Sequence, residues 1–293
     1  MKINKSMKTS MSLAVVAMAC FAMTTSTNAA TLWTPANITT AAWYDASDAL
    51  TITAAGSSVS QWDDKSGNGI DLTGTASTVT SSIGGLNVIR FDGISTTGNR
   101  LSNTSFAVNS ENLSFFYVRE VVSAGSHQAF NIGRNTNTEG NIREGSNGGT
   151  GRIFGSRFPD NQGITVSSGD LDAKLVSYVK AGTNSQEVWF DGTSEGTNGS
   201  LHTTFTSERI DVGGGNSALR ANYDFGEIVV VDSALSTDDR ERVEGYLAWK
   251  WGLEGSLDSS HTYKLTAPTA VPEPSTTALL GLGGLALILR RRK

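Results

Sequence analysis

The apolar residues in the middle of this chain come in short runs of β-branched and aromatic side chains. The run LSFFYVREVV places Leu113, Phe115 and Tyr117 on one face of a strand and Phe116 and Val118 on the other. Successive strand residues point to opposite faces, so a run that is apolar on both faces predicts a central strand packed on two sides.

Similar runs recur along the chain, and turn residues bound them. They are LNVIRFDG (86–93), KLVSYVKAG (174–182), QEVWFDGTSEG (186–196), RIDVGGG (209–215) and FGEIVVVDSAL (225–235). Asp191-Gly192 is a dipeptide typical of hairpin turns. Long helical patterns that would build βαβ units are absent between the runs, so the sequence predicts an all-β domain.

The length and charge of the middle limit the function classes. Residues 31–270 make about 240 residues, a size that suits one large β-domain. Without the basic residues of the two ends this part keeps 16 of 23 basic and 27 of 28 acidic residues, a net charge of about −11. Such a charge disfavours nucleic acid, whose phosphates would be repelled.

One helix is predicted near the end of the domain. Ser236 is a cap residue, and Asp239 three positions later is the acidic partner of a capping box. Val243, Leu247 and Trp251 form an apolar stripe at helical spacing, and Gly252 follows as a stop signal. We expect this helix to pack on the sheet.

The first 30 residues have the pattern of a secretory signal peptide. A positive start with Lys2, Lys5 and Lys8 precedes an apolar core, and small residues favour cleavage near Ala29 or Ala30. Cys20, the single cysteine, lies inside this segment, and Ala17 stands where a lipoprotein signal would have Leu. The mature domain then lacks cysteine, so its stability has to come from a core.

The last residues, 269–293, combine a Pro-Glu-Pro motif with a short apolar stretch. Residues 276–289 carry no charge and would span about 21 Å as a helix, against about 30 Å of membrane hydrocarbon. A permanent short tail anchor is one interpretation. The motif Val271, Pro272, Glu273, Pro274 and the basic tail Arg290, Arg291, Arg292 resemble the PEP-CTERM sorting signal of Gram-negative bacteria.

That resemblance implies transient membrane insertion of a short C-terminal apolar helix and processing by an exosortase. It further implies export through the inner membrane to the cell surface or the extracellular matrix.

Several pieces of the middle resemble the laminin-G-like or concanavalin A-like lectin/glucanase superfamily. They are WYDASDALTI (43–52), VSQWDDKSGNGIDLTG (59–74), LNVIRFDG and the helix segment 227–253. The resemblance implies a jelly-roll sandwich of two curved antiparallel sheets over residues 31–268, with one C-terminal helix. Residues 131–166 carry little of it, and we expect a variable loop region there.

Catalytic motifs are weak in this sequence. The Glu-x-Asp-x-Glu strand of the superfamily's glucanases is missing, and Glu139 and Glu144 are expected in a loop, whereas Glu187 stands alone. The helix acids Asp238, Asp239, Glu241 and Glu244 are expected to face solvent. His127, His202 and His261 are too scattered to predict a zinc site, and His261 is expected to be structural. We therefore expect a protein without catalytic activity.

The loop DDKSGNGID is a candidate Ca²⁺ site. Asp64, Ser66, Asn68 and Gly69 match positions 1, 3, 5 and 6 of an EF-hand loop, and Asp63 before them is a further candidate ligand. At position 12, however, Thr75 stands where the bidentate Glu would be. Lys65 would repel a cation. The alternative interpretation is a tight turn built from Asp, Ser, Asn and Gly.

Binding of sugar needs an exposed aromatic face and polar groups for the hydroxyls. Trp62 and Trp189, with Trp33, are candidates for the first role, and Asn131, Asn135, Asn137 and Asn147 for the second. The sequence favours a non-catalytic secreted protein that binds exopolysaccharide. The alternatives are a structural or adhesive surface protein and, less well supported, a glycoside hydrolase.

Overall fold

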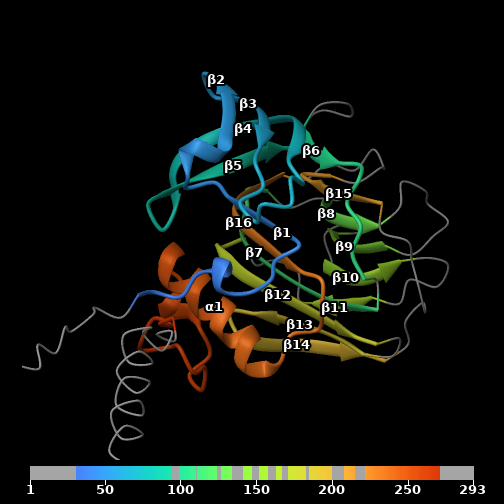
Figure 1. Cartoon of the computed structure of the whole chain (residues 1–293), viewed down its shortest axis with the longest axis vertical. Helices are drawn as coiled ribbons and strands as arrows, with labels where there is room; N and C mark the ends of the chain where they lie inside the picture. Colours follow the sequence, from blue (N-terminus) through green and yellow to red (C-terminus); the bar gives the residue numbers. More distant parts are fainter. Residues whose placement is uncertain are drawn as a thin grey trace, which may run out of the picture.

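The computed structural model describes residues 31–93, 99–109, 111–123, 127–133, 141–146, 152–157, 163–166, 171–182, 185–199, 208–214 and 222–270. These residues contain sixteen strands, one α-helix and three short 3-10 helices (Figure 1). The strands are β1 Ala42–Asp45, β2 Ile52–Ala55, β3 Ser58–Trp62, β4 Leu72–Ile83, β5 Leu86–Asp92, β6 Arg100–Asn103, β7 Asn112–Val121, β8 His127–Gly133, β9 Asn141–Ser146, β10 Arg152–Arg157, β11 Ile164–Val166, β12 Lys174–Ala181, β13 Gln186–Phe190, β14 Thr193–Asn198, β15 Arg209–Val212 and β16 Asn222–Val231. The helices are η1 Pro35–Asn37, η2 Ala49–Thr51, α1 Thr237–Trp251 and η3 Glu254–Ser256.

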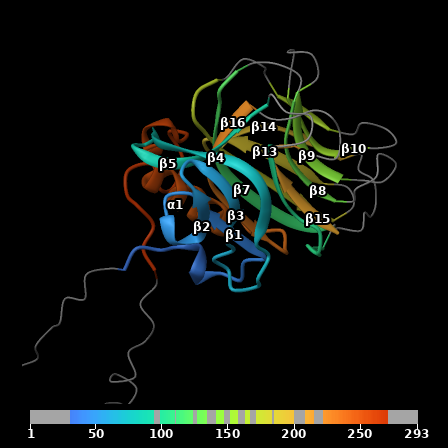
Figure 2. The same ribbon diagram turned by 90° about the horizontal axis from the view of Figure 1, so that it is seen from above.

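The strands form one curled antiparallel sheet. Its main path runs β11-β10-β9-β8-β15-β6-β4-β5-β16-β7-β12-β13-β14, while β1 joins β16 and the β2–β3 hairpin joins β4. Figure 2 shows the sheet wrapping round, and Asn198 of β14 donates a hydrogen bond to the carbonyl of Gly163, next to β11, at 3.3 Å. The predicted all-β fold is confirmed, but the two expected sheets belong to a single hydrogen-bonded sheet.

β7 lies at the centre of this arrangement, between β16 and β12. Its Phe115 and Tyr117 are buried in the interior core between the layers, and Phe116 and Val118 are buried in a second core on the outer face. The predicted central strand packed on two sides is therefore confirmed.

The other predicted strands are present as β5, β12, β13, β15 and β16. The turn between β13 and β14 is at Asp191-Gly192, where both residues have positive φ, 50° and 79°. The expectation of a loop region over residues 131–166 is wrong for the part that the structure describes. That part continues the sheet through β8, β9, β10 and β11. The sequence did not predict these strands because they are short and carry few apolar residues.

Helix α1 covers the outer face of the sheet. Ser236 caps it by accepting a hydrogen bond from the amide of Asp239, and Gly252 ends it with a left-handed φ of 69°. Val243, Leu247 and Trp251 are buried in the outer core, as predicted. Beneath the Trp251 ring lies Gly226, where a Cβ would meet the ring at 2.8 Å.

The two ends of the described chain lie side by side. Leu32 and Thr269 form an antiparallel bridge, and Trp33 donates to the carbonyl of Pro268 at 3.0 Å. The expected signal peptide with Ala29 and Ala30, the sorting motif and the basic tail lie outside the described residues. Within those residues, no helix has the length and apolar character needed to span a membrane.

Candidate functional site

A row of polar side chains crosses the outer face of the neighbouring strands β8, β15, β6 and β4. Strand alternation places Leu101, Ile210 and Val212 in the interior core, so their neighbours in sequence face outward. The strand registers pair Asn131 with Asp211, and Asp211 with Ser102.

Asp211 is the centre of this row and is fully buried. Its carboxylate accepts hydrogen bonds from Ser102 Oγ at 2.6 Å, Arg209 Nη2 at 2.6 Å and Asn131 Nδ2 at 3.1 Å. Arg100 Nε lies 3.7 Å from the same carboxylate. The hydrogen bonds therefore hold the Arg209 guanidinium, a hydroxyl and an amide in place, and the Arg100 guanidinium lies within ion-pair distance.

Beside this row lies a cleft of about 450 Å³. Among the described residues its lining consists almost wholly of hydroxyl, amide, carboxylate and guanidinium groups: Asp71, Thr73, Thr75, Arg100, Ser102, Asn103, Thr104, Ser105 and Arg209, with Gly74. The Nε of Arg209 is buried and has no hydrogen-bond partner in the described part of the chain. The cleft can thus offer several donors and acceptors to a hydroxyl-rich ligand.

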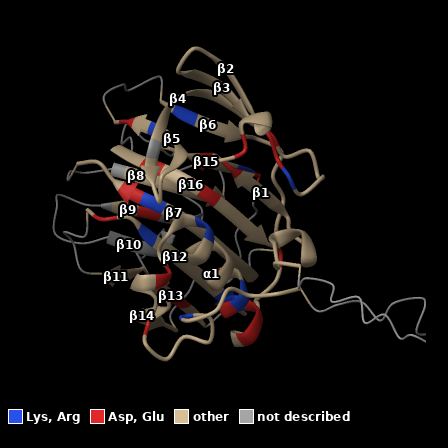
Figure 3. Ribbon diagram, turned by 90° about the vertical axis from the view of Figure 1, so that its left-hand side faces the viewer, with Lys and Arg blue, Asp and Glu red and all other residues tan. Residues whose placement is uncertain are grey.

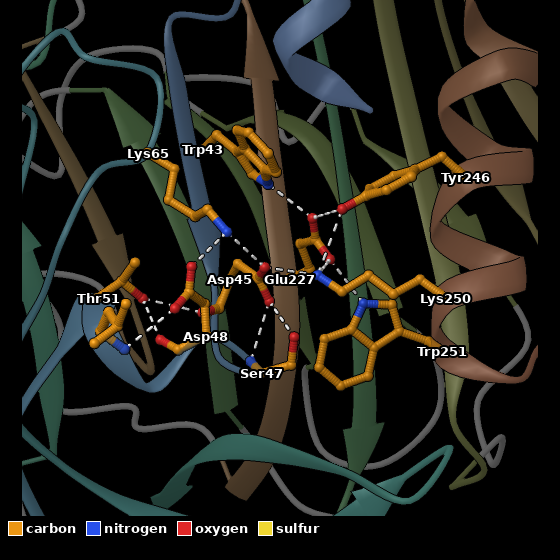
Figure 4. Close-up of polar contacts among 11 residues, drawn as sticks. Trp43, Asp45, Ser47, Asp48, Thr51, Lys65, Glu227, Tyr246, Lys250 and Trp251 are labelled. Atoms are coloured by element: carbon orange, nitrogen blue, oxygen red, sulfur yellow. Dashed lines mark hydrogen bonds and ion pairs between the residues drawn. The ribbon is translucent and has the colours of Figure 1, made fainter. Parts of the chain in front are cut away.

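The segments 43–52 and 227–253, from the two ends of the domain, come together in a buried polar network under α1 (Figure 4). At its centre Glu227 of β16 is fully buried. Its carboxylate accepts from Trp43 Nε1 at 2.7 Å, Tyr246 OH at 2.9 Å, Trp251 Nε1 at 2.9 Å and Lys250 Nζ at 2.6 Å. Burial raises the pKa of Glu227, and nearby Asp45 adds to this, whereas Lys250 opposes it.

Asp45 of β1 is the second carboxylate of the network. Lys250 Nζ lies 2.7 Å and Lys65 Nζ 2.9 Å from its Oδ2. Burial alone would raise its pKa, but Lys250, Ser47 and Lys65 together hold the pKa of Asp45 below its usual value. Every residue that Figure 4 labels forms a hydrogen bond or an ion pair with another residue of the network. These contacts connect β1, β16 and α1.

The side chains of the candidate Ca²⁺ loop are engaged in hydrogen bonds within the protein. Asp64 Oδ1 accepts from the amides of Trp43 and Ser66, both at 2.9 Å, and Oδ2 accepts from Ser66 Oγ at 2.7 Å and from the amide of Ile70 at 3.2 Å. Asn68 turns its amide nitrogen to the carbonyl of Thr40 at 2.8 Å. Asp63 accepts from Gln61 Nε2 at 2.7 Å. Both oxygens of Asp64 thus accept donors of the protein itself, which favours the tight turn of the alternative interpretation, and Ca²⁺ binding stays a prediction.

The aromatic candidates for sugar contact are mostly packing residues. Trp62 is fully buried against Tyr44 and cannot meet a sugar, so this prediction is wrong; its strand position already favoured the core. Trp33 is buried as well. Trp189 is half-buried with the Arg240 guanidinium 4.4 Å from its ring, and its role stays a prediction.

Among the candidate asparagines, Asn131 lies buried in β8, whereas Asn135, Asn137 and Asn147 lie outside the described residues.

For two glutamates, Glu144 and Glu244, the expectation from the sequence is wrong. Glu144 lies buried in β9, where it accepts from Tyr117 OH at 2.5 Å and pairs with Arg119 at 3.5 Å. Glu244 faces the sheet and not solvent; it pairs with Arg240 and its Oε2 lies 3.0 Å from His261 Nε2. An i, i+4 Arg–Glu spacing on α1 was the available signal. The expected structural role of His261 agrees with its burial here.

A third feature is an apolar groove of about 330 Å³ beside the chain ends. It is lined by Leu32, Trp33, Thr34, Tyr246, Trp249, Lys250, Ala267 and Pro268. Trp249 is 38 % exposed and donates its Nε1–H to the carbonyl of Tyr263 at 2.8 Å. The sequence favours a packing role for Trp249, but its ring is partly exposed beside this groove.

The comparisons with known proteins concern the tail and the fold separately. The PEP-CTERM protein-sorting motif family matches residues 270–293. Proteins with this motif are exported and anchored at the bacterial cell surface, and the motif implies processing by an exosortase. Among curated proteins, none matches the sequence.

The fold is similar to that of sugar- and protein-binding structures. With the Trypanosoma rangeli sialidase in complex with sialic acid the TM-score is 0.53 at 12% identity, covering 71% of this chain and 33% of that one. With the binding domain of botulinum neurotoxin DC in complex with SialylT the TM-score is 0.52 at 12% identity, covering 69% and 50%. The same domain in complex with rat synaptotagmin II gives 0.55 at 11% identity, covering 72% and 52%.

This chain thus spans about a third to a half of those structures, and the similarity concerns the fold alone. The chain therefore carries a PEP-CTERM sorting motif behind a curled β-domain of concanavalin A-like, lectin-type architecture.

Proposed function

We propose that this chain is a non-catalytic surface or matrix protein that binds polysaccharide in the cleft between β4, β6 and β15. The observation that carries the proposal is the lining of that cleft, which consists of polar groups held in place by a buried carboxylate. Sugars are recognised by such placed hydroxyl, carboxylate and guanidinium groups, because each can meet a ligand hydroxyl.

The charge of the cleft supports a neutral, hydroxyl-rich glycan. Arg100 and Arg209 are matched locally by Asp71 and by Asp211 beneath them. In Figure 3, basic and acidic positions lie close together on the strands. Fold relatives crystallised with sialic acid and with SialylT support a sugar-binding role.

The test is affinity electrophoresis of residues 31–270 through the matrix polysaccharide of the producing bacterium. We expect retardation of the wild-type domain and about three- to tenfold weaker binding for Thr73→Val, because that change removes one hydroxyl contact and keeps the strand-favouring shape. Thr53→Val on β2, also an exposed strand threonine, is the matched control and should migrate as wild type. Unretarded wild-type protein would overturn the proposal for that polysaccharide.

A second candidate function is adhesion to a protein, favoured by the apolar groove with Trp249. The botulinum domain in complex with synaptotagmin shows a similar fold engaged with a protein. If Trp249→Ala abolishes adhesion between cells while Thr73→Val leaves it intact, the adhesive function is favoured over glycan binding.

A further inference from the structure

The network under α1 holds an amine against a carboxyl group, with a second carboxylate in contact with that amine. Lys250 Nζ lies 2.7 Å from Asp45 Oδ2 and 2.6 Å from Glu227 Oε2. We propose that Lys250 and Asp45 become joined by an intramolecular isopeptide bond, with Glu227 as the catalytic proton acceptor. This inference is independent of the proposed glycan binding.

The fold fixes the three groups on three different elements. Asp45 on β1 and Glu227 on β16 are direct cross-strand partners in the register of the sheet. Lys250 reaches them from the last turn of α1, and Trp251 beside it anchors that turn in the outer core. The reacting groups are thus brought into contact by the folded backbone, which gives the advantage of a reaction within one molecule.

The carboxyl group of Asp45 is held as an electrophile. Ser47 donates to its Oδ1 from the backbone amide at 3.1 Å and from Oγ at 2.6 Å. These two donors are placed to stabilise negative charge on that oxygen when the carbon is attacked. Lys65 Nζ donates to the other oxygen, Oδ2, at 2.9 Å, and can supply a proton to it as it leaves.

The two carboxyl groups of the network are shielded from water. Glu227 is fully buried and Asp45 is 4% exposed. The Lys250 Nζ lies 5.5 Å from the Trp251 ring centroid and 5.7 Å from that of Tyr246. Burial imposes a desolvation cost on the ionised carboxyl groups, which the ion pairs and ring contacts of Lys250 offset. Conversion of one ammonium and one carboxylate to an amide removes both charges and with them that cost.

The reaction balances with the groups present. Glu227 takes a proton from the Lys250 ammonium, and the free amine attacks Cγ of Asp45. The tetrahedral intermediate collapses, Oδ2 leaves as water with the protons from Glu227 and Lys65, and Lys65 regains one from the amide nitrogen through the leaving water. One ammonium and one carboxylate thus become one amide and one water, with no oxidant or cofactor.

Lys65 is a less suitable nucleophile although it contacts the same oxygen. Its Nζ pairs with Asp48 at 2.8 Å and lies 4.7 Å from the Trp43 ring, whereas Glu227 is engaged by Lys250. The two lysines therefore have different roles, which substitution can separate.

The experiment is mass spectrometry of the full chain after trypsin digestion. A bond at Lys250 blocks cleavage there, so the peptide 243–264 should remain joined to the peptide that ends at Lys65, with a mass lower by one water than the sum of the two. The peptide 243–264 does not depend on how the ends of the chain are processed, whereas the peptide that ends at Lys65 begins at Thr9 or, after cleavage of the expected signal peptide, near Ala30.

Matched variants assign the roles. Lys250→Arg and Glu227→Gln should lose the joined peptides, and Lys65→Arg should slow their formation, because a guanidinium does not supply the proton that the leaving oxygen takes. Lys264→Arg is the control outside the network, since Lys264 Nζ donates to the carbonyls of Gly255 and Leu257, and it should keep the joined peptides, apart from the altered residue. Circular dichroism of each variant establishes that it is folded. Separate peptides 243–250 and 251–264 from folded wild-type protein would leave the contacts as ion pairs and overturn the proposal, and a joined peptide in Lys250→Arg would overturn the assignment to Lys250.

Discussion

Buried charged side chains in this domain form ion pairs with specific partners. The Arg240–Glu244 pair on α1 illustrates how much stability such a pair contributes. Arg240 donates to both oxygens of Glu244, at 2.7 and 2.5 Å, and His261 approaches the same carboxylate. Glu244 is fully buried and Arg240 nearly so, and loss of the carboxylate charge would leave the Arg240 guanidinium without its main partner.

We expect Glu244→Gln to lower the free energy of unfolding by about 3–5 kcal/mol, the range found when one member of a buried ion pair is removed. Glu241→Gln, one turn position away and partly exposed, should cost about 0–1 kcal/mol. Urea unfolding of both variants measures the difference. Equal midpoints would show that the Glu244 pair contributes no more than a surface pair.

At the scale of elements, β16 changes its neighbour in mid-strand. Its first half pairs with β5 up to Phe225, and its second half pairs with β1 from Glu227 onward. Gly226 lies between them at a β-bulge, where the ring of Trp251 packs on the backbone. The bulge thus allows one strand to serve two neighbours and lets α1 approach the sheet.

Replacing this glycine should disturb both contacts. We expect Gly226→Ala to destabilise the domain by about 1–3 kcal/mol, because a Cβ at 2.8 Å from the Trp251 ring forces the ring to move. Gly255→Ala is the control, since a Cβ there meets nothing within 4 Å. Thermal unfolding followed by tryptophan fluorescence compares them, and an unchanged melting temperature for Gly226→Ala would contradict this account.

The strands and the helix could be predicted from the sequence because their apolar spacing is strong over many residues. Phe115 to Val118 in β7 and Val243, Leu247 and Trp251 in α1 are examples. The strands β9 and β10 escaped prediction because Gly, Asn and Arg dominate them. The polar cleft escaped as well, because Thr73, Ser102 and Arg209 lie far apart in the sequence and meet only through strand pairing.

At the scale of the whole molecule, several tyrosines are buried in the two cores, and most of them lie beside a carboxylate. Burial raises the pKa of Tyr44, Tyr117, Tyr178 and Tyr246, and carboxylates beside three of them add to the effect: Asp64, Glu144 and Glu227. The raised pKa in the folded state means that these tyrosines favour folding below their unfolded pKa of about 10 and cease to do so as the pH rises above it.

We therefore expect alkaline unfolding that begins above about pH 10. Ionisation of the buried tyrosines, followed by ultraviolet absorbance, should coincide with loss of the β-sheet signal in circular dichroism. Tyrosinate absorbance equivalent to all six tyrosines while the sheet signal is intact would contradict the burial described here.

The pairing of the two chain ends has a mechanical consequence for a protein held at the surface by its C-terminal end. Tension would enter at Ala270 and first break the hydrogen bonds of the short bridge to residues 31–33. The segment from Gly252 to Ala270 would then peel away, releasing about 60 Å of slack before α1 is loaded. With the proposed bond between Lys250 and Asp45 in place, peeling would halt at that residue, and the segment would act as an extensible spring in series with a sheet that stays folded.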